Sequence, residues 1–179
     1  MTGLPKTLST RRIRDEWPPI SVDEVELPSG ERRDWIRLHF GVSAAVLAMT
    51  KDGRVLITRG YRHGLGRAAY GLPGGIARTG EAPEACARRE LLEETGHEAA
   101  RLLPLYEGNN LGAYLEGALH LFFAKDCLRT DRAPDPNETE DVETLTIRDA
   151  LDRARRGEFE SSVVTLAILL ADARGWLAP

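Results

Sequence analysis

The chain has 179 residues, which is enough for one well-buried domain and too few for two ordinary domains with a linker. Its formal net charge of −4 and its pI near 5.6 indicate no broad basic surface, so we expect no nucleic-acid partner. The longest apolar stretch, 163–171, is too short to span a bilayer, and 1–16 lacks the apolar core of a signal peptide, so we expect no membrane partner. The two cysteines, Cys86 and Cys127, are typical of a reducing compartment, and we expect a cytoplasmic location.

The first part of the chain is dominated by predicted strands. Apolar runs bounded by turn residues predict strands over 20–27, 34–40, 42–49 and 54–59. The pair Asp52-Gly53 predicts a hairpin turn between the last two of them. Residues 60–70 are rich in glycine and arginine and predict a loop.

The second part of the chain mixes strands and helices. The patterns predict strands over 99–106, 118–125 and 142–147, and helices over 148–156 and 162–174. An acidic, proline-bearing loop is predicted over 128–141. The last helix is apolar nearly all round, so we expect it to be buried. Together these elements predict an α/β (α+β) fold in which a mixed sheet packs between helical layers.

The most informative stretch is a glycine-rich bend followed by an acidic helix, 74–96. Read as a helix, Glu90, Glu93 and Glu94 lie at i, i+3 and i+4, so their carboxylates share one side. Such like charges repel each other unless a cation neutralises them, and carboxylate oxygens suit Mg²⁺, with Mn²⁺ as a substitute. Arg89 lies four residues before Glu93 and can orient its carboxylate. Mg²⁺ also binds substrate phosphates, so a phosphorylated small molecule is the expected partner.

A solvated acidic helix face is the alternative interpretation of this stretch. A merely solvated helix needs neither the paired glycines Gly74-Gly75 nor an acid at the fixed offset of Glu81. It also needs no Pro73 to stiffen the approach to the bend. The flanking residues therefore favour a metal site.

These residues resemble the signature of the Nudix hydrolases, in which a glycine, a glutamate and an Arg-Glu pair precede a Glu-Glu pair and a second glycine at fixed spacings. The positions that match are Gly75, Glu81, Arg89, Glu90, Leu91, Glu93, Glu94 and Gly96. One position departs from the signature, because His97 stands where the family prefers an apolar side chain.

The resemblance implies a Nudix α/β/α sandwich over 42–179, preceded by an N-terminal β-hairpin extension over 1–41. It also implies attack by water on the diphosphate of a nucleoside diphosphate derivative. In that reaction Glu90 and Glu94 are the best direct metal ligands, with the Gly74 carbonyl beside them. Glu93 is then a ligand either directly or through water.

A further acid is needed to accept the proton of the attacking water, because the helix carboxylates are engaged with metal. In the ADP-ribose pyrophosphatases of the family the base comes from a late acidic loop of the form Glu-x-Glu-x-apolar. The stretch 138–142 has that form, which implies Glu138 as the base and Glu140 as the runner-up. A solvated loop is the alternative.

Several features resemble the branch that acts on ADP-ribose or nucleoside diphosphate sugars and releases AMP and a sugar phosphate. They are the N-terminal hairpin, Arg62 after a Gly-Tyr pair, and a terminal helix pair. The resemblance implies that Arg62 binds the diphosphate, that Trp17 stacks on the base, and that the hairpin forms a homodimer. A solvated arginine and a packing tryptophan are the alternatives.

Two departures set this chain apart from that branch. The branch usually has Glu-Leu-Pro-Ala-Gly before the signature, whereas 71–75 is Gly-Leu-Pro-Gly-Gly, a form common in triphosphate and dinucleoside polyphosphate hydrolases. Leu111 also stands where the branch tends to have proline. A non-catalytic nucleotide sensor is a third possibility, although such domains usually lose signature glutamates and this chain keeps all of them.

Overall fold

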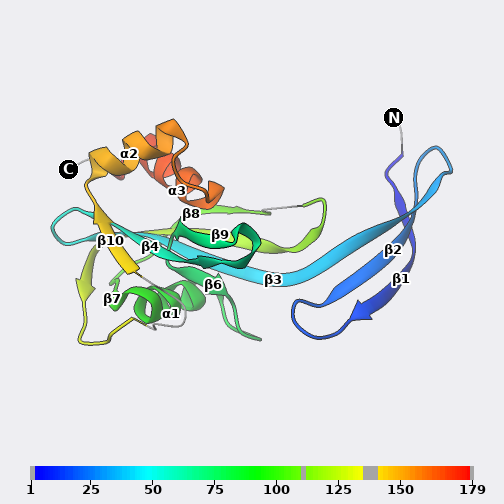
Figure 1. Cartoon of the computed structure of the whole chain (residues 1–179), viewed down its shortest axis with the longest axis horizontal. Coiled ribbons are helices and arrows are strands. Elements are labelled where there is room, and N and C mark those ends of the chain that lie inside the picture. Colours follow the sequence, from blue (N-terminus) through cyan, green and yellow to red (C-terminus); the bar gives the residue numbers. More distant parts are fainter. Residues whose placement is uncertain (1–2, 110–111, 135–140, 178–179) are drawn as a thin grey trace. The chain divides into compact units, whose positions relative to one another are not determined.

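A computed structural model describes residues 3–109, 112–134 and 141–177 (Figure 1). The chain forms two compact units. The N-terminal unit comprises Met1–Val42 with Gly108–Ala118, and the core unit comprises Ser43–Glu107 with Leu119–Pro179. The predicted extension, 1–41, thus falls within the N-terminal unit, which also takes in a segment from the middle of the chain.

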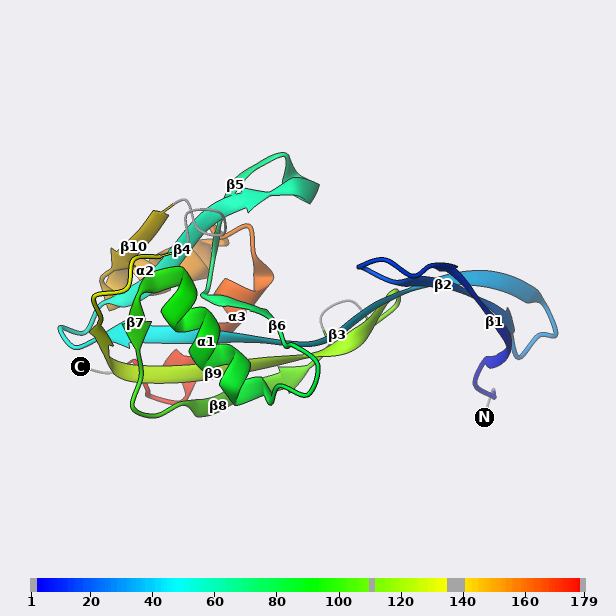
Figure 2. The ribbon, with the colours of Figure 1, turned by 90° about the horizontal axis from the view of Figure 1, so that it is seen from below.

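The N-terminal unit is built on three antiparallel strands (Figure 2). They are β1 (Lys6–Arg14), β2 (Ile20–Glu26) and the first part of β3 (Arg32–Thr50). The predicted strands over 20–27 and 34–40 are confirmed, but β1 was not predicted. Its nine residues are all exposed, so it lacks the apolar alternation on which a strand prediction depends.

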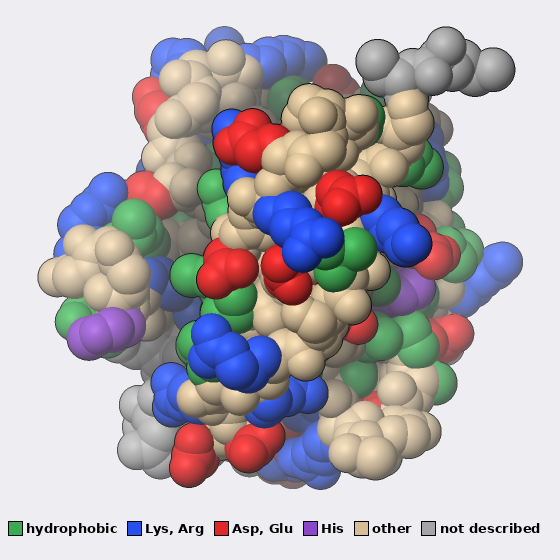
Figure 3. All heavy atoms as spheres, turned by 90° about the vertical axis from the view of Figure 1, so that its right-hand side faces the viewer, with side chains coloured by type: hydrophobic (Ala, Val, Ile, Leu, Met, Phe, Trp, Pro, Cys, Tyr) green, Lys and Arg blue, Asp and Glu red, His purple; other side chains and the backbone are tan. Residues whose placement is uncertain are grey.

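A polar network joins the strands of the N-terminal unit to its second segment. Arg37 donates from Nη2 to Asp23 Oδ1 at 2.9 Å and from Nη1 to Glu116 Oε2 at 3.4 Å. His39 Nδ1 lies 2.6 Å from Glu116 Oε2, and its Nε2 lies 2.8 Å from the buried Ser21 hydroxyl. Figure 3 shows acidic and basic side chains interspersed over the face that it presents. Pairing of opposite charges therefore stabilises a sheet with little apolar core of its own.

The core unit contains the rest of the sheet. Its strands are the second part of β3, β4 (Val55–Arg62), β5 (Arg67–Gly71), β6 (Gly74–Ile76), β7 (His97–Glu98), β8 (Leu103–Gly108), β9 (Leu115–Arg129) and β10 (Asp141–Leu145). β3 pairs with β4, β6 and β9, while β4 also pairs with β5 and β10. Strands 34–40 and 42–49, predicted separately, are one continuous strand, and the glycine between them, Gly41, is accommodated at φ +70°.

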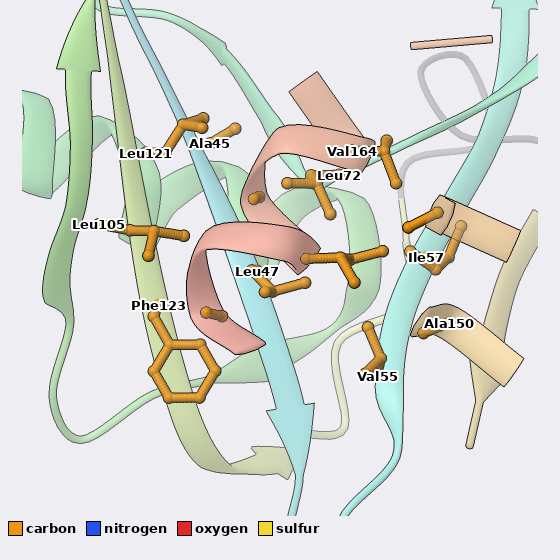
Figure 4. Close-up of a cluster of buried hydrophobic side chains, with 14 of the residues drawn as sticks. Ala45, Leu47, Val55, Ile57, Leu72, Leu105, Leu121, Phe123, Ala150 and Val164 are labelled. Carbon is orange, nitrogen blue, oxygen red and sulfur yellow. The ribbon is translucent and has the colours of Figure 1, made fainter. Parts of the chain in front are cut away.

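Helices cover both faces of this sheet. α2 (Ile147–Arg156) and α3 (Ser162–Ala173) pack on one face against Leu47, Ile57 and Phe123 (Figure 4). α1 (Pro83–Thr95) packs on the other face, where Leu91 joins a second cluster of buried residues that includes Leu56. Because side chains alternate along a strand, neighbouring residues of β4 serve opposite clusters. The predicted α/β/α sandwich is confirmed, and so is the burial of the last helix.

The prediction of a loop over 60–70 was wrong. β4 continues to Arg62, a short 3-10 turn follows over His63–Leu65, and β5 begins at Arg67. These residues are largely exposed and polar, so the strands carry no apolar pattern. No helix within the described residues is long and apolar enough to cross a membrane.

Candidate functional site

The glycine bend brings backbone against strand and helix at once. A Cβ added at Gly74 would lie 2.5 Å from the Ala44 carbonyl oxygen and from the Ala45 Cβ. A Cβ added at Gly75 would collide with the Glu90 carboxylate. Only glycine leaves room for both approaches, so the pair of glycines places β6 directly beside the acidic face of α1.

Helix α1 is held at both ends by residues suited to helix termini. Pro83 begins the helix, where its missing N–H costs nothing, and Gly96 ends it at φ +67° with its N–H donating to the Leu92 carbonyl. Glu90 is 6% exposed and Glu94 is 8% exposed, and acids are buried to this degree where they are paired or bound to metal. The helix therefore presents two nearly buried carboxylates at a fixed place in the core unit.

Both of these carboxylates reach the glycine bend. Gly74 N–H donates to Glu94 Oε2 at 3.2 Å, and Glu90 lies against Gly75. Two carboxylates at one bend provide oxygen donors of the kind that hard divalent cations prefer. The residues at this bend thus fit a Mg²⁺ or Mn²⁺ ion.

Arg89 connects the acids of the signature. It donates to both carboxylate oxygens of Glu81, from Nε at 2.8 Å and from Nη2 at 2.9 Å. Its Nη1 donates to Glu90 Oε1 at 2.6 Å and to Glu93 Oε2 at 3.0 Å. The hydrogen bonds from Arg89 lower the pKa of Glu81 to about 2, and the same bonds raise the pKa of Arg89. Glu81 and Arg89 are therefore both charged across the physiological pH range.

The third carboxylate of the helix turn points elsewhere. Glu93 lies among three arginines, with Arg132 Nη2 at 3.5 Å and Arg78 Nη2 at 3.9 Å in addition to Arg89. In the described part of the chain, no three His, Cys, Asp or Glu side chains gather as a metal cluster. Instead of three converging carboxylates, the structure has two at the glycine bend and one beside the arginines. Sequence reasoning missed Arg78 and Arg132, because no spacing rule links residues of separate loops to the helix.

The other predicted site residues lie as follows. Arg62 ends β4, and its guanidinium Nη2 would be 2.8 Å from a Cβ at Gly71. Trp17 belongs to the N-terminal unit, where it is 59% exposed and meets Phe40 edge-on at 5.2 Å between ring centroids. Glu138 and Glu140 lie outside the described residues.

Two further acids, Glu107 and Glu116, are alternative candidates for the general base. Glu107 is exposed and lies 3.9 Å from His120 Nδ1, beside a cavity of about 470 Å³ at the start of α1. Glu116 belongs to the N-terminal unit and is engaged by Arg37 and His39. Glu107 therefore has fewer and longer ionic contacts than Glu116.

Comparison with known proteins agrees with this geometry. The family profile of the NUDIX domain matches residues 39–165. The chain is 32% identical over 151 residues to the ADP-ribose pyrophosphatase of Bacillus subtilis (strain 168), which covers 82% of this chain and 80% of that protein. It is 30% identical over 168 residues to the methanol dehydrogenase activator of Bacillus methanolicus, covering 91% and 90% of the two chains.

A solved structure described as an ADP compounds hydrolase superposes with a TM-score of 0.82. It is 20% identical and covers 99% of this chain and 96% of that one, so it supports the fold alone. The chain belongs to the Nudix family, as its signature predicts. It is accordingly a pyrophosphohydrolase, and the predicted likeness to the ADP-ribose branch is confirmed by its relatives.

Proposed function

We propose that this enzyme uses Mg²⁺ to cleave ADP-ribose or a related ADP-sugar into AMP and a sugar phosphate. The observation that carries the proposal is the arrangement along 71–75. One end of this segment lies against the Arg62 guanidinium and the other against the buried Glu90 and Glu94. A cation and a metal-binding pair at the two ends of five residues suit a diphosphate. Two relatives named ADP-ribose pyrophosphatase support the choice of sugar nucleotide.

In the proposed mechanism Glu90 and Glu94 hold the metal beside Gly74, and Arg89 keeps Glu90 in place through its 2.6 Å hydrogen bond. A bound divalent cation would neutralise the diphosphate and make a bound water more acidic. Glu93 acts as a ligand through water or directly. Arg62 orients the diphosphate by hydrogen bonds to its oxygens. Glu138 accepts the proton of the attacking water, with Glu140 as the runner-up.

A triphosphate or dinucleoside polyphosphate is the second candidate substrate. It is favoured by the sequence Leu72-Pro73-Gly74-Gly75, in which glycine replaces the alanine usual in the ADP-ribose branch. The two candidates share the metal site and differ in what lies beyond the diphosphate.

A cytoplasmic location is also proposed, and the free thiols of Cys86 and Cys127 support it.

The decisive experiment is a substrate panel with product identification. We expect ADP-ribose or an ADP-sugar to have a higher kcat/KM than nucleoside triphosphates and dinucleoside polyphosphates, with AMP and a sugar phosphate as products. Activity should need Mg²⁺ or Mn²⁺ and stop with a chelator, because the carboxylates of Glu90 and Glu94 supply oxygen donors that suit a hard divalent cation. A preference for triphosphates would favour the second candidate, and full activity in excess EDTA would exclude the proposed mechanism. A nucleotide-sensing module would release no product at all.

The metal ligands can be tested by removing one charge at a time. Glu90→Gln and Glu94→Gln keep the side-chain shape, so each should reduce kcat by about 10²–10³ through loss of electrostatic stabilisation. Glu84→Gln on the same helix is the matched control, because Glu84 is exposed and pairs only with Arg88 among the described residues. A loss of less than tenfold at both ligand positions would show that other residues bind the metal.

The general base is tested by a second pair of variants. Glu138→Gln should reduce kcat strongly and change KM and metal affinity little, because a base acts in the transition state. Glu140→Gln should cost less. The reverse order would move the base by two residues, and two active variants would direct attention to Glu107 or Glu116.

We also propose that the protein is a homodimer formed through its N-terminal unit. Trp35 is 47% exposed, Ile36 53% and Tyr114 62%, and all three line a cavity of about 510 Å³ in that unit. Contiguous exposed apolar surface is typical of an interaction site, and a small sheet gains stability when a second copy covers it. Sedimentation at micromolar concentration measures the state, and a monomer would contradict the proposal.

Trp17 is proposed to stack on the adenine base. Its exposed ring is free on the sides that Phe40 does not cover, and stacking on an aromatic contributes about 1–3 kcal/mol per base. Trp17→Ala should therefore raise KM for ADP-ribose roughly 5- to 150-fold and leave metal binding unchanged. An unchanged KM would mean that Trp17 only packs against Phe40.

A further inference from the structure

One buried hydroxyl in the core unit has no hydrogen-bond partner within the described residues. Thr58 is 2% exposed, and its Oγ1 is enclosed without a donor or acceptor in that part of the chain. Buried polar atoms are nearly always satisfied, since each one left unpaired costs free energy. A buried hydroxyl without a partner at the edge of the candidate site therefore suggests that it gains a hydrogen bond when substrate binds.

The partner nearest at hand is a guanidinium. A Cβ added at Gly71 would lie 3.2 Å from Thr58 Oγ1 and 2.8 Å from Arg62 Nη2, so both groups lie against the same side of this glycine. Gly71 is the cross-strand neighbour of Thr58 in the β4–β5 ladder. Arg62, four residues further along β4, points to the same face because side chains alternate along a strand.

Arg62 is also available. Its guanidinium makes no hydrogen bond or ion pair with any side chain in residues 3–109, 112–134 and 141–177. A guanidinium has five donors in a planar fork, and a threonine oxygen accepts through its lone pairs. The Arg62 guanidinium can donate the hydrogen bond that the Thr58 oxygen can accept, and within the described residues neither group has such a partner.

The face that they share is that of the metal site. Leu56, two residues before Thr58, belongs to the cluster that packs under α1, and so does Val142, the neighbour of Thr58 on β10. Gly71 precedes Gly74 by three residues, which span at most about 10 Å when extended. A guanidinium held at Gly71 is thus within reach of the far end of a diphosphate bound at Gly74.

We propose that Thr58 is a positioning residue for Arg62, which rests on the function proposed above. In the substrate complex the Thr58 hydroxyl accepts one N–H of the guanidinium, and the remaining donors face the oxygens of the nucleoside diphosphate. Gly71 leaves the space in which the guanidinium lies. Gly71, which stands in place of the glutamate of the usual Glu-Leu-Pro-Ala-Gly sequence, is thereby part of the diphosphate site.

Two variants of Thr58 separate the hydroxyl from its shape. Thr58→Val replaces the hydroxyl by a methyl group of similar size and should raise KM about 5- to 30-fold with a much smaller change in kcat, as expected for loss of a hydrogen bond to a charged group. Thr58→Ser keeps the hydroxyl and should restore KM to within about threefold of the wild type. An unchanged KM in Thr58→Val, or equal defects in both variants, would overturn the proposal.

The unfolding temperature separates this role from a packing role of Thr58, because loss of packing would lower it. Removing an unpaired buried hydroxyl in favour of a methyl group is neutral or stabilising, so Thr58→Val should unfold at the same or a higher temperature while it binds substrate less well. A lower Tm together with a proportional loss of active protein would reduce the effect to packing.

A double-mutant cycle tests whether Thr58 acts through Arg62. In an Arg62→Ala background, Thr58→Val should change KM by less than twofold, because the group that it positions is absent. Gly71→Ala should raise KM in the wild type, since its Cβ meets Nη2, and have little effect in the Arg62→Ala background. Additive effects would show that Thr58 and Gly71 act independently of Arg62.

Failure of the proposed function is distinguishable from failure of this inference. If the panel shows that the wild type cleaves only triphosphates, the substrate proposal fails, and the same cycle is measured on the triphosphate because every candidate contains a diphosphate linkage. Coupling between Thr58 and Arg62 on that substrate would support the inference by itself. Absence of coupling on the substrate that the wild type cleaves would overturn it.

Discussion

The arrangement of the candidate site depends on one cation, the Arg89 guanidinium. The sequence places three glutamates within one turn of α1, and their mutual repulsion would oppose the helix if nothing balanced it. Arg89 donates to Glu90 and Glu93 from one nitrogen and to Glu81 from two others, with its side chain only 17% exposed. In this low-exposure setting each hydrogen bond gains strength from charge. The carboxylates are therefore oriented before any metal binds, which reduces the free energy needed to organise the site.

The second constraint is the absence of side chains at three glycines. Gly74 and Gly75 allow β6 to approach β3 and the Glu90 carboxylate, and Gly71 allows Arg62 to lie on the strand next to its own. A methyl group at Gly75 would displace the Glu90 carboxylate, one at Gly71 would displace the Arg62 guanidinium, and one at Gly74 would collide with β3. Glycine thus acts here by letting charged groups approach the backbone closely. The bend and the glycine that contacts Arg62 belong to one short segment, 71–75.

Residues close in sequence could be predicted, and residues joined only by folding could not. The spacing of Glu90, Glu94 and Arg89 follows from helix periodicity, so their places on one helix could be predicted from the chain. Arg78 and Arg132 come from loops before and after the helix, and neither the fully exposed strand β1 nor the five-residue strand β5 carries an apolar period. Polar edges and long-range pairs depend on tertiary contacts that no local pattern encodes.

The same reasoning explains why position 71 and position 58 have to be considered together. A glutamate at 71, as in the resembled branch, would bring a carboxylate that could hold an arginine by itself. Glycine removes that acceptor, so an arginine at 62 needs another one. The hydroxyl of Thr58, buried across the ladder from Gly71, is the acceptor that the described residues supply. A neutral acceptor, unlike a glutamate at 71, does not offset the positive charge of Arg62, which favours its attraction for an anionic substrate.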